Sequence, residues 1–129
     1  MIRRLRAFPV QIESRDPRGA REAVRLLQAG EAVMIFPEGS RSLDGSIGRF
    51  KPGAFRLAVS VGAPVLPVTI AGGHASWPPG RLLPRPASMT ITYHPLVYPA
   101  GGDDPRDAAR ELAERTRAVI GRAGSMPSR

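Results

Sequence analysis

The pattern of apolar and polar positions predicts a first helix that begins after Asp16-Pro17 and ends before Gly30. An aspartate followed by proline is typical of an N-cap and the first helical turn, and glycine is typical of the position after a helix. The apolar positions between them have the spacing of one helix face. That face consists of Ala20, Ala23, Val24 and Leu27. Short apolar runs at Leu5–Ile12 and Glu31–Phe36 predict one strand on each side of this helix, and the second run is expected to be buried.

The remainder of the chain predicts two more helices and two more strands. One helix begins near Gly53 and ends at Gly62, and another follows the Asp104-Pro105 pair. Strands are expected in "APVLPVTIAG" (63–72) and "SMTITYHPLVY" (88–98), separated by a long Gly/Pro-rich loop. Pro67 has no ladder donor, so it should sit at an edge, an end or a bulge. The final helix presents Ala109, Leu112, Ala113, Thr116 and Ile120 on one face.

This order of elements predicts an α/β domain with a largely parallel sheet flanked by helices. We assign residues 1–120 to one domain and residues 121–129 to a disordered tail. In open sheets of this kind ligands bind at the carboxyl ends of strands. The loop 37–52 leaves one of those ends, which makes it the first place to look for a site.

Composition narrows the choice of function. The 129 residues include no cysteine, and the only histidines, His74 and His94, lack metal-ligand spacing, so we expect neither a disulfide framework nor a metal site. The net charge of +8 comes from nineteen cations, of which Lys51 is the single lysine. This excess fits either a preference for arginine codons or a surface that meets phosphate esters, anionic lipid or nucleic acid. One Trp, two Tyr and no recognised nucleic-acid motif argue against nucleic acid.

No membrane-spanning or targeting segment is evident in the sequence. The longest uncharged stretch, Leu57–Gly80, is interrupted by several glycines and prolines, so it is not a continuous apolar helix of about twenty residues. The basic start "MIRRLRAF" lacks the apolar region of a signal peptide. We therefore expect a cytoplasmic protein that can contact a membrane surface peripherally.

The loop 37–52 has the residues of an anion site. Gly39, Gly45 and Gly48 allow backbone N–H groups to converge on a ligand. Arg41 can hold a phosphate with a planar fork, and Lys51 adds a point charge. The helix that begins near Gly53 directs its positive end to the same region. The plain alternative is an ordinary solvated connection in which Glu38 and Arg41 form a surface ion pair.

Within this loop, "FPEGSRS" (Phe36–Ser42) resembles the F-P-E-G-[TS]-R-S block of the glycerolipid acyltransferases, the superfamily of 1-acylglycerol-3-phosphate acyltransferases. "RFKPGAF" and Val65-Leu66-Pro67-Val68 resemble the family's next two blocks. "AFPV" (Ala7–Val10) resembles an upstream block, although the arginine that follows it in the family is Gln11 here.

The resemblance implies acyl transfer from acyl-CoA or acyl carrier protein to the hydroxyl of a lysophosphatidic acid-like acceptor, in bacterial-type phospholipid biosynthesis. By position, Glu38, Gly39, Ser40, Arg41 and Lys51 would hold the glycerol phosphate. Phe36, Pro37 and Pro67 would shape the acyl or acceptor pocket. The family needs no metal or organic cofactor, and its partners are the lysophospholipid, the acyl donor and the inner face of the membrane.

The family's general base is absent from this sequence. It belongs to an H-x-x-x-x-D block ahead of the phosphate motif, but His74 and His94 both follow that motif and have Pro79 and Pro99 at the aspartate offset. His74 is expected at a surface or pocket rim and His94 in a structural role. We interpret the chain as a truncated acyltransferase domain without a catalytic residue of its own. The alternative is a naturally short, non-catalytic module that binds phosphate headgroups or an anionic membrane.

Overall fold

The structure is a computed structural model, and it describes residues 18–40 and 42–124. The strand expected at Leu5–Ile12 and the cap at Asp16-Pro17 lie outside the described residues. The elements are α1 (Arg18–Gln28), α2 (Pro52–Val61), β1 (Val68–Ala71), α3 (Gly73–Ser76), β2 (Thr90–Tyr93) and α4 (Pro105–Gly124).

The three predicted helices are confirmed, and their ends follow from local chemistry. Gly62 ends α2 with a φ of 67°, a left-handed conformation that glycine adopts without strain. Asp104 begins α4, where its Oδ1 accepts a hydrogen bond of 2.7 Å from the backbone N–H of Arg106. The tail expected from Gly121 was placed too early, because α4 continues to Gly124.

The sheet differs from the prediction. Its two described strands, β1 and β2, run antiparallel, with register from Val68 opposite Tyr93 to Ala71 opposite Thr90. A bridge between Val65 and Val97 extends the pairing on the other side of Pro67. The largely parallel sheet that we expected is not seen among residues 18–40 and 42–124. Only two strands pair here, and they follow each other in sequence, which permits the antiparallel return.

Pro67 lies at the irregular position that its missing N–H requires. It falls between the Val65–Val97 bridge and β1, and its carbonyl oxygen accepts a hydrogen bond of 3.0 Å from the backbone N–H of His94. The pairing of the two strands is thus interrupted at the proline, which has no backbone N–H to donate to a neighbouring strand.

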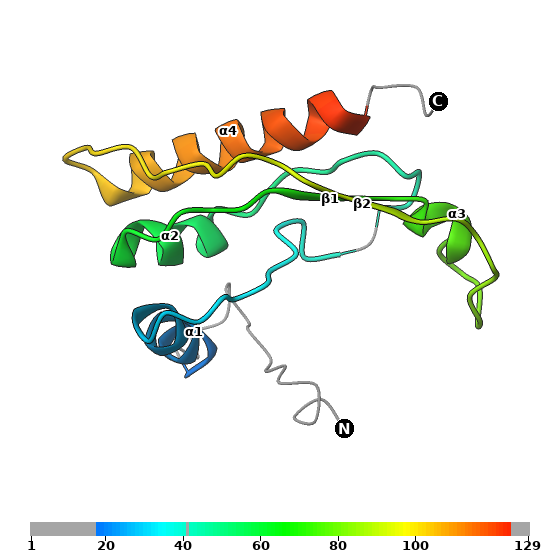
Figure 1. The fold of residues 1–129 in the computed structure, drawn as a ribbon, viewed down its shortest axis with the longest axis horizontal. Coiled ribbons are helices and arrows are strands. Elements are labelled where there is room, and N and C mark those ends of the chain that lie inside the picture. The colour runs from blue at the N-terminus through cyan, green and yellow to red at the C-terminus, as the bar shows by residue number, and fades with distance from the viewer. Residues whose placement is uncertain (1–17, 41, 125–129) are drawn as a thin grey trace.

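The core is formed where α4 packs on α2 and β1 (Figure 1), and α1 contacts α2. Leu112 of α4 is fully buried, and the rings of Phe50 and Phe55 stack 6.1 Å apart at the start of α2. The apolar face predicted for the last helix is therefore the buried one. The buried cluster consists of Phe50, Phe55, Ala58, Val97, Ala109, Leu112 and Ala113.

The strand predicted at Glu31–Phe36 is wrong for the described structure. This segment pairs with no other described strand, and its side chains are not buried. Met34 and Phe36 are 82% and 68% exposed. An apolar, β-branched-rich run favours a strand only when a neighbouring strand supplies hydrogen-bond partners, and the described sheet lies elsewhere.

No helix within the described ranges is long and apolar enough to cross a membrane.

Candidate functional site

The two ends of the loop 37–52 are joined at the start of α2. The backbone N–H of Lys51, the N-cap residue of α2, donates a hydrogen bond of 2.9 Å to the carbonyl oxygen of Pro37. Gly39 has a φ of 72°, and a Cβ there would lie 3.0 Å from Cε of Lys51. The positive φ favours glycine at this position, and the end of the Lys51 side chain would have to shift by a few tenths of an ångström to admit a Cβ. The turn at Glu38-Gly39 and the positive end of α2 consequently lie against each other.

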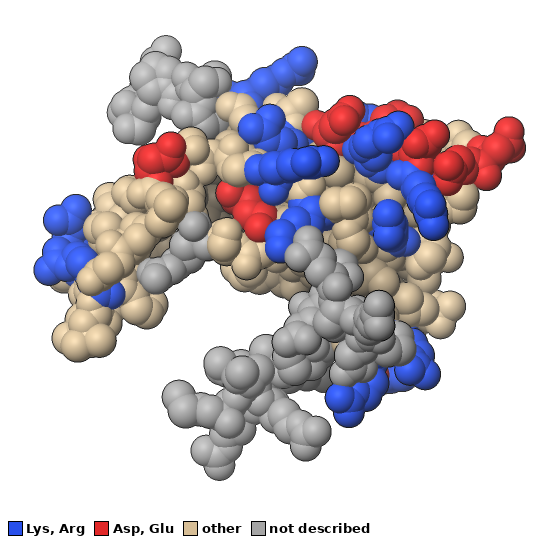
Figure 2. Space-filling view, turned by 180° about the vertical axis from the view of Figure 1, so that it is seen from behind, with Lys and Arg blue, Asp and Glu red and all other residues tan. Residues whose placement is uncertain are grey.

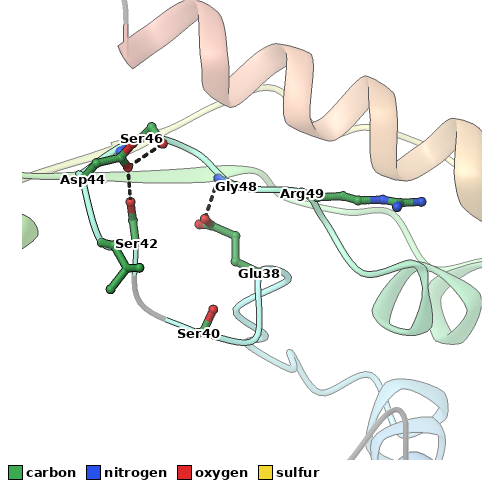
Figure 3. A pocket seen from close by; sticks show the side chains of 8 residues that line it. Glu38, Ser40, Ser42, Asp44, Ser46, Gly48 and Arg49 are labelled. Atoms are coloured by element: carbon green, nitrogen blue, oxygen red, sulfur yellow. Dashed lines mark hydrogen bonds between the residues drawn. The ribbon is translucent and has the colours of Figure 1, made fainter. Parts of the chain in front are cut away.

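Glu38 crosses the loop from one side to the other. Its Oε2 accepts a hydrogen bond of 2.7 Å from the backbone N–H of Gly48 (Figure 3), and the bond is partly buried. The carboxylate of Glu38 is thus bound by a backbone N–H that belongs to a residue ten positions later. Gly48 lacks the positive φ of Gly39 and Gly45. A Cβ at Gly48 would instead lie 2.9 Å from Glu38 Oε2.

Asp44 organises the outer end of the loop. Its Oδ1 accepts hydrogen bonds from the hydroxyl of Ser46 at 2.6 Å, the backbone N–H of Ser46 at 2.9 Å and the hydroxyl of Ser42 at 3.0 Å (Figure 3). The Ser46 hydroxyl, with the other two donors, lowers the pKa of Asp44 from its ordinary 3.8 to about 2. Asp44 is therefore a carboxylate that shapes its own turn.

Arg117 of α4 donates hydrogen bonds to the backbone of the loop at Ile47 and Gly48. Its Nε donates to the carbonyl oxygen of Gly48 at 3.0 Å, and its Nη2 donates to that of Ile47 at 3.1 Å. A guanidinium is suited to this role because its donors are fixed in one plane. The loop is therefore attached to the core through a helix about seventy residues further along the chain.

An open hollow of about 370 Å³ lies within the loop. We call it the site hollow. Its lining consists of Glu38, Ser40, Ser42, Leu43, Asp44, Ser46, Gly48 and Arg49. In Figure 3, Arg49 points away from Glu38. Because the described lining includes two carboxylates, a phosphate bound here would need cations from the rim.

The structure brings some of the predicted site residues together. Glu38 and Ser40 line the site hollow, and Gly39 contacts Lys51 beside it. Phe36 and Pro37 lead into the same turn, where Phe36 is largely exposed. Arg41, the predicted phosphate fork, lies outside the described residues.

Pro67 is fully buried and does not line the site hollow. Its role in the acyl or acceptor pocket therefore stays a prediction.

The two histidines differ in their surroundings. Nε2 of half-buried His94 lies 2.8 Å from Oγ1 of Thr69, which agrees with the structural role expected of it. His74 is exposed on α3, and a Cβ at Gly45 would lie 3.5 Å from Cγ of its ring. This places His74 beside the outer end of the loop, as expected of a rim residue. Within residues 18–40 and 42–124, no group of three His, Cys, Asp or Glu side chains is placed to hold a metal ion.

Sequence reasoning missed three contributors to the site. The Asp44-Gly45-Ser46 triplet carries a usable signal, because aspartate and serine near a glycine favour a side-chain-stabilised turn. The N–H of Gly48 as the partner of Glu38 has no such signal. Arg117 has none either, since its contacts with Ile47 and Gly48 depend on the tertiary fold.

Comparison with known proteins gives a consistent result. A family model described as Acyltransferase matches residues 1–71. The chain is 34% identical over 111 residues to a chloroplastic 1-acyl-sn-glycerol-3-phosphate acyltransferase of Brassica napus, covering 81% of this chain and 32% of that protein. It is 34% identical over 117 residues to the Pseudomonas aeruginosa 1-acyl-sn-glycerol-3-phosphate acyltransferase, covering 87% and 44%.

A solved structure agrees with the curated relatives. The crystal structure of the 1-acyl-sn-glycerophosphate (LPA) acyltransferase of Thermotoga maritima superposes with a TM-score of 0.71 at 32% identity, covering 87% of this chain and 46% of that one. The chain thus spans about a third to somewhat under a half of the length of these relatives.

Proposed function

Since this chain belongs to the acyltransferase family, we propose that it is part of an enzyme that transfers an acyl group from acyl-CoA or acyl carrier protein to a lysophosphatidic acid-like acceptor. In this reaction the acceptor hydroxyl attacks the thioester carbonyl, the thiol leaves, and a general base takes the hydroxyl proton. The proposal needs no metal or organic cofactor. It places the chain at the inner face of a membrane, because the acceptor is a membrane lipid.

The observation that carries the proposal is the contact between the Glu38-Gly39 turn and the N-cap of α2. Lys51 bonds to Pro37 and packs on Gly39, so two segments that resemble family blocks meet at one place. A helix N-terminus and an ammonium group at the same turn favour a phosphate monoester. We assign the glycerol phosphate to this place, with Arg41 as its bidentate partner.

Glu38 takes a different part in this assignment. A carboxylate repels phosphate, and the Oε2 of Glu38 is already engaged by the Gly48 N–H. We therefore infer that Glu38 fixes the shape of the loop, while Gly39, Ser40, Arg41 and Lys51 face the phosphate.

Binding of glycerol 3-phosphate by calorimetry tests the assignment. Arg41→Ala should weaken binding by roughly 1.5–3 kcal/mol, which is the usual worth of hydrogen bonds to charged groups. Arg41→Lys should recover only part of the loss, because an ammonium cannot reproduce the fork. The matched control is Arg122→Ala, on the exposed last turn of α4, which should change binding little. Equal losses at Arg41 and Arg122 that both vanish in added salt would indicate diffuse attraction and contradict the site.

A second candidate function is a module that binds phosphate and catalyses no reaction. The surroundings of the two histidines favour it, because no described carboxylate orients either of them as a general base. Neither His74 nor His94 has a hydrogen bond to a carboxylate within residues 18–40 and 42–124. An oriented base contributes roughly 10²–10⁴-fold to the rate, so the 129-residue chain should show no measurable turnover of acyl-CoA with lysophosphatidic acid. Turnover that His74→Ala abolishes would contradict this expectation and make His74 the base.

A further inference from the structure

A segment between β1 and β2 projects from the end of the molecule that is opposite the start of α4 (Figure 1). We call residues 77–85 the projecting loop. Its base is closed by Ser76, whose carbonyl oxygen accepts from the N–H of Arg85 at 2.8 Å and whose hydroxyl donates to the Arg85 carbonyl oxygen at 3.0 Å. Nε of Arg85 also donates to the carbonyl oxygen of Ala75 at 2.6 Å. These bonds give the loop a defined shape instead of leaving it an open tether.

The outer part of the projecting loop is apolar and uncovered. Leu82 and Leu83 are 90% and 71% exposed, although both are large aliphatic side chains. Trp77 stands at the base, where its indole N–H donates to the carbonyl oxygen of Arg81 at 2.9 Å. Two adjacent leucines are held in water by a loop of fixed shape. A partner that buries them lowers the free energy, because apolar surface is removed from water.

The positive charge around these leucines favours an anionic partner. Arg81 and Arg85 flank them, and the sequence contains no aspartate or glutamate between Asp44 and Asp103. Figure 2 shows basic side chains at the outer end of this projection, at the left of the view. Two exposed leucines flanked by arginines, with a tryptophan at the base of the loop, match the layers of a bilayer surface. Leucine enters the hydrocarbon, and arginine and tryptophan remain at the level of the headgroups.

We propose that the projecting loop docks on a bilayer that contains anionic phospholipid, inserting Leu82 and Leu83 and placing Arg81 and Arg85 on lipid phosphates. The inference rests on the proposed function, because a lysophospholipid acceptor would bring the protein to a membrane. The docking itself requires neither acyl transfer nor the site hollow.

Trp77 is the only tryptophan of the chain, so its fluorescence reports on this loop alone. The 129-residue chain is titrated with vesicles of phosphatidylcholine, with and without phosphatidylglycerol. Vesicles with phosphatidylglycerol should shift the Trp77 emission to shorter wavelength, and brominated acyl chains should quench it. Vesicles of phosphatidylcholine alone should bind at least about fivefold more weakly, because each arginine near an anionic surface contributes about that factor.

Variants locate the contact. Leu82→Ser with Leu83→Ser should lower the partition coefficient by about a hundredfold or more, since burying one leucine contributes roughly tenfold or more. Arg81→Gln should lower it about fivefold. The matched controls are Met34→Ser, which removes a side chain that is 82% exposed elsewhere, and Arg106→Gln in the first turn of α4. Both controls should stay within about twofold of the parent chain.

Several results would overturn the proposal. These are no binding to anionic vesicles, vesicle sedimentation without any change at Trp77, or an equal loss in Met34→Ser. Trp77 quenching in the parent chain is informative by itself, so the test survives if the double leucine variant fails to fold. Binding of glycerol 3-phosphate is followed by calorimetry and vesicle binding is followed at Trp77, so failure of the phosphate site and failure of the projecting loop are separate outcomes.

Discussion

The hydrogen bond between Glu38 and Gly48 gives a direct test of how the site loop is held. Glu38→Ala removes the carboxylate that bridges the loop and leaves the Gly48 N–H without its protein partner. Hydrogen bonds to charged groups contribute about 1.5–3 kcal/mol when buried. Because this bond is only partly buried, we expect the lower end, a loss of about 1–2 kcal/mol in the free energy of unfolding.

Gly48→Ala disturbs the same bond from the other side. The added Cβ would lie 2.9 Å from Glu38 Oε2, so the carboxylate has to move. It is the end of a flexible side chain, and Gly48 lacks a positive φ, so we expect a smaller loss of about 0.5–1.5 kcal/mol. In the double variant the Cβ meets no carboxylate. The combined loss should therefore fall short of the sum by at least about 0.5 kcal/mol.

Urea unfolding of the four chains, followed by circular dichroism, measures this double-mutant cycle. The matched control is Glu22→Ala, which removes a carboxylate of the exposed Glu22–Arg25 pair on α1. It should cost less than Glu38→Ala, because both partners are solvated. Losses at Glu38 and Gly48 that add within about 0.3 kcal/mol would refute the bond as a structural link.

Two further predictions concern the glycine before α3 and the turn at Asp44. Gly72→Ala should cost more than about 2 kcal/mol of unfolding free energy, because Gly72 has a φ of 87° and an added Cβ would run into the carbonyl oxygen of Ser88. Neighbouring Gly73→Ala, which meets open space, should be nearly neutral, and equal melting temperatures for the two variants would contradict this reasoning. The folded pKa of Asp44, about 2, lies below its ordinary 3.8, so its stabilising contribution is present above pH 3.8 and is lost as the pH falls toward 2. NMR titration of the Asp44 carboxyl should show this low midpoint and its rise in Ser46→Ala; an unchanged midpoint would disprove the role of Ser46.

The helices could be predicted because their determinants lie close together in sequence. The apolar spacing from Ala20 to Leu27 and the Asp104 cap act within one or two turns, and both are observed. The run at Glu31–Phe36 shows the opposite case. Its composition favours a strand, but pairing depends on a neighbour that composition does not specify, and the described sheet forms between β1 and β2 instead.

The candidate site also contains features that the sequence indicates and features that depend on the tertiary fold. The sequence assigned Gly39 and Lys51 to one loop, with Gly39 supplying a backbone conformation closed to other residues, and the structure shows the positive φ and the contact between the two. The partner of Glu38 could not be predicted. Any of several N–H groups would satisfy a carboxylate, and the choice of Gly48 depends on how the whole loop closes.

The contacts that close that loop extend beyond the residues that the family model matches. The family model ends at residue 71, whereas Arg117 holds the carbonyl oxygens of Ile47 and Gly48 from α4. The backbone N–H of Gly48 donates to Glu38, while the carbonyl oxygen of Gly48 accepts from Arg117. Gly48 is therefore bonded both to the Phe36–Ser42 motif and to α4. Movement of the loop at Gly48 relative to α4 has to break its hydrogen bonds with Arg117. The position of the proposed phosphate site relative to α2 is therefore set by the packing of α4 on α2 as well as by the residues of the motif.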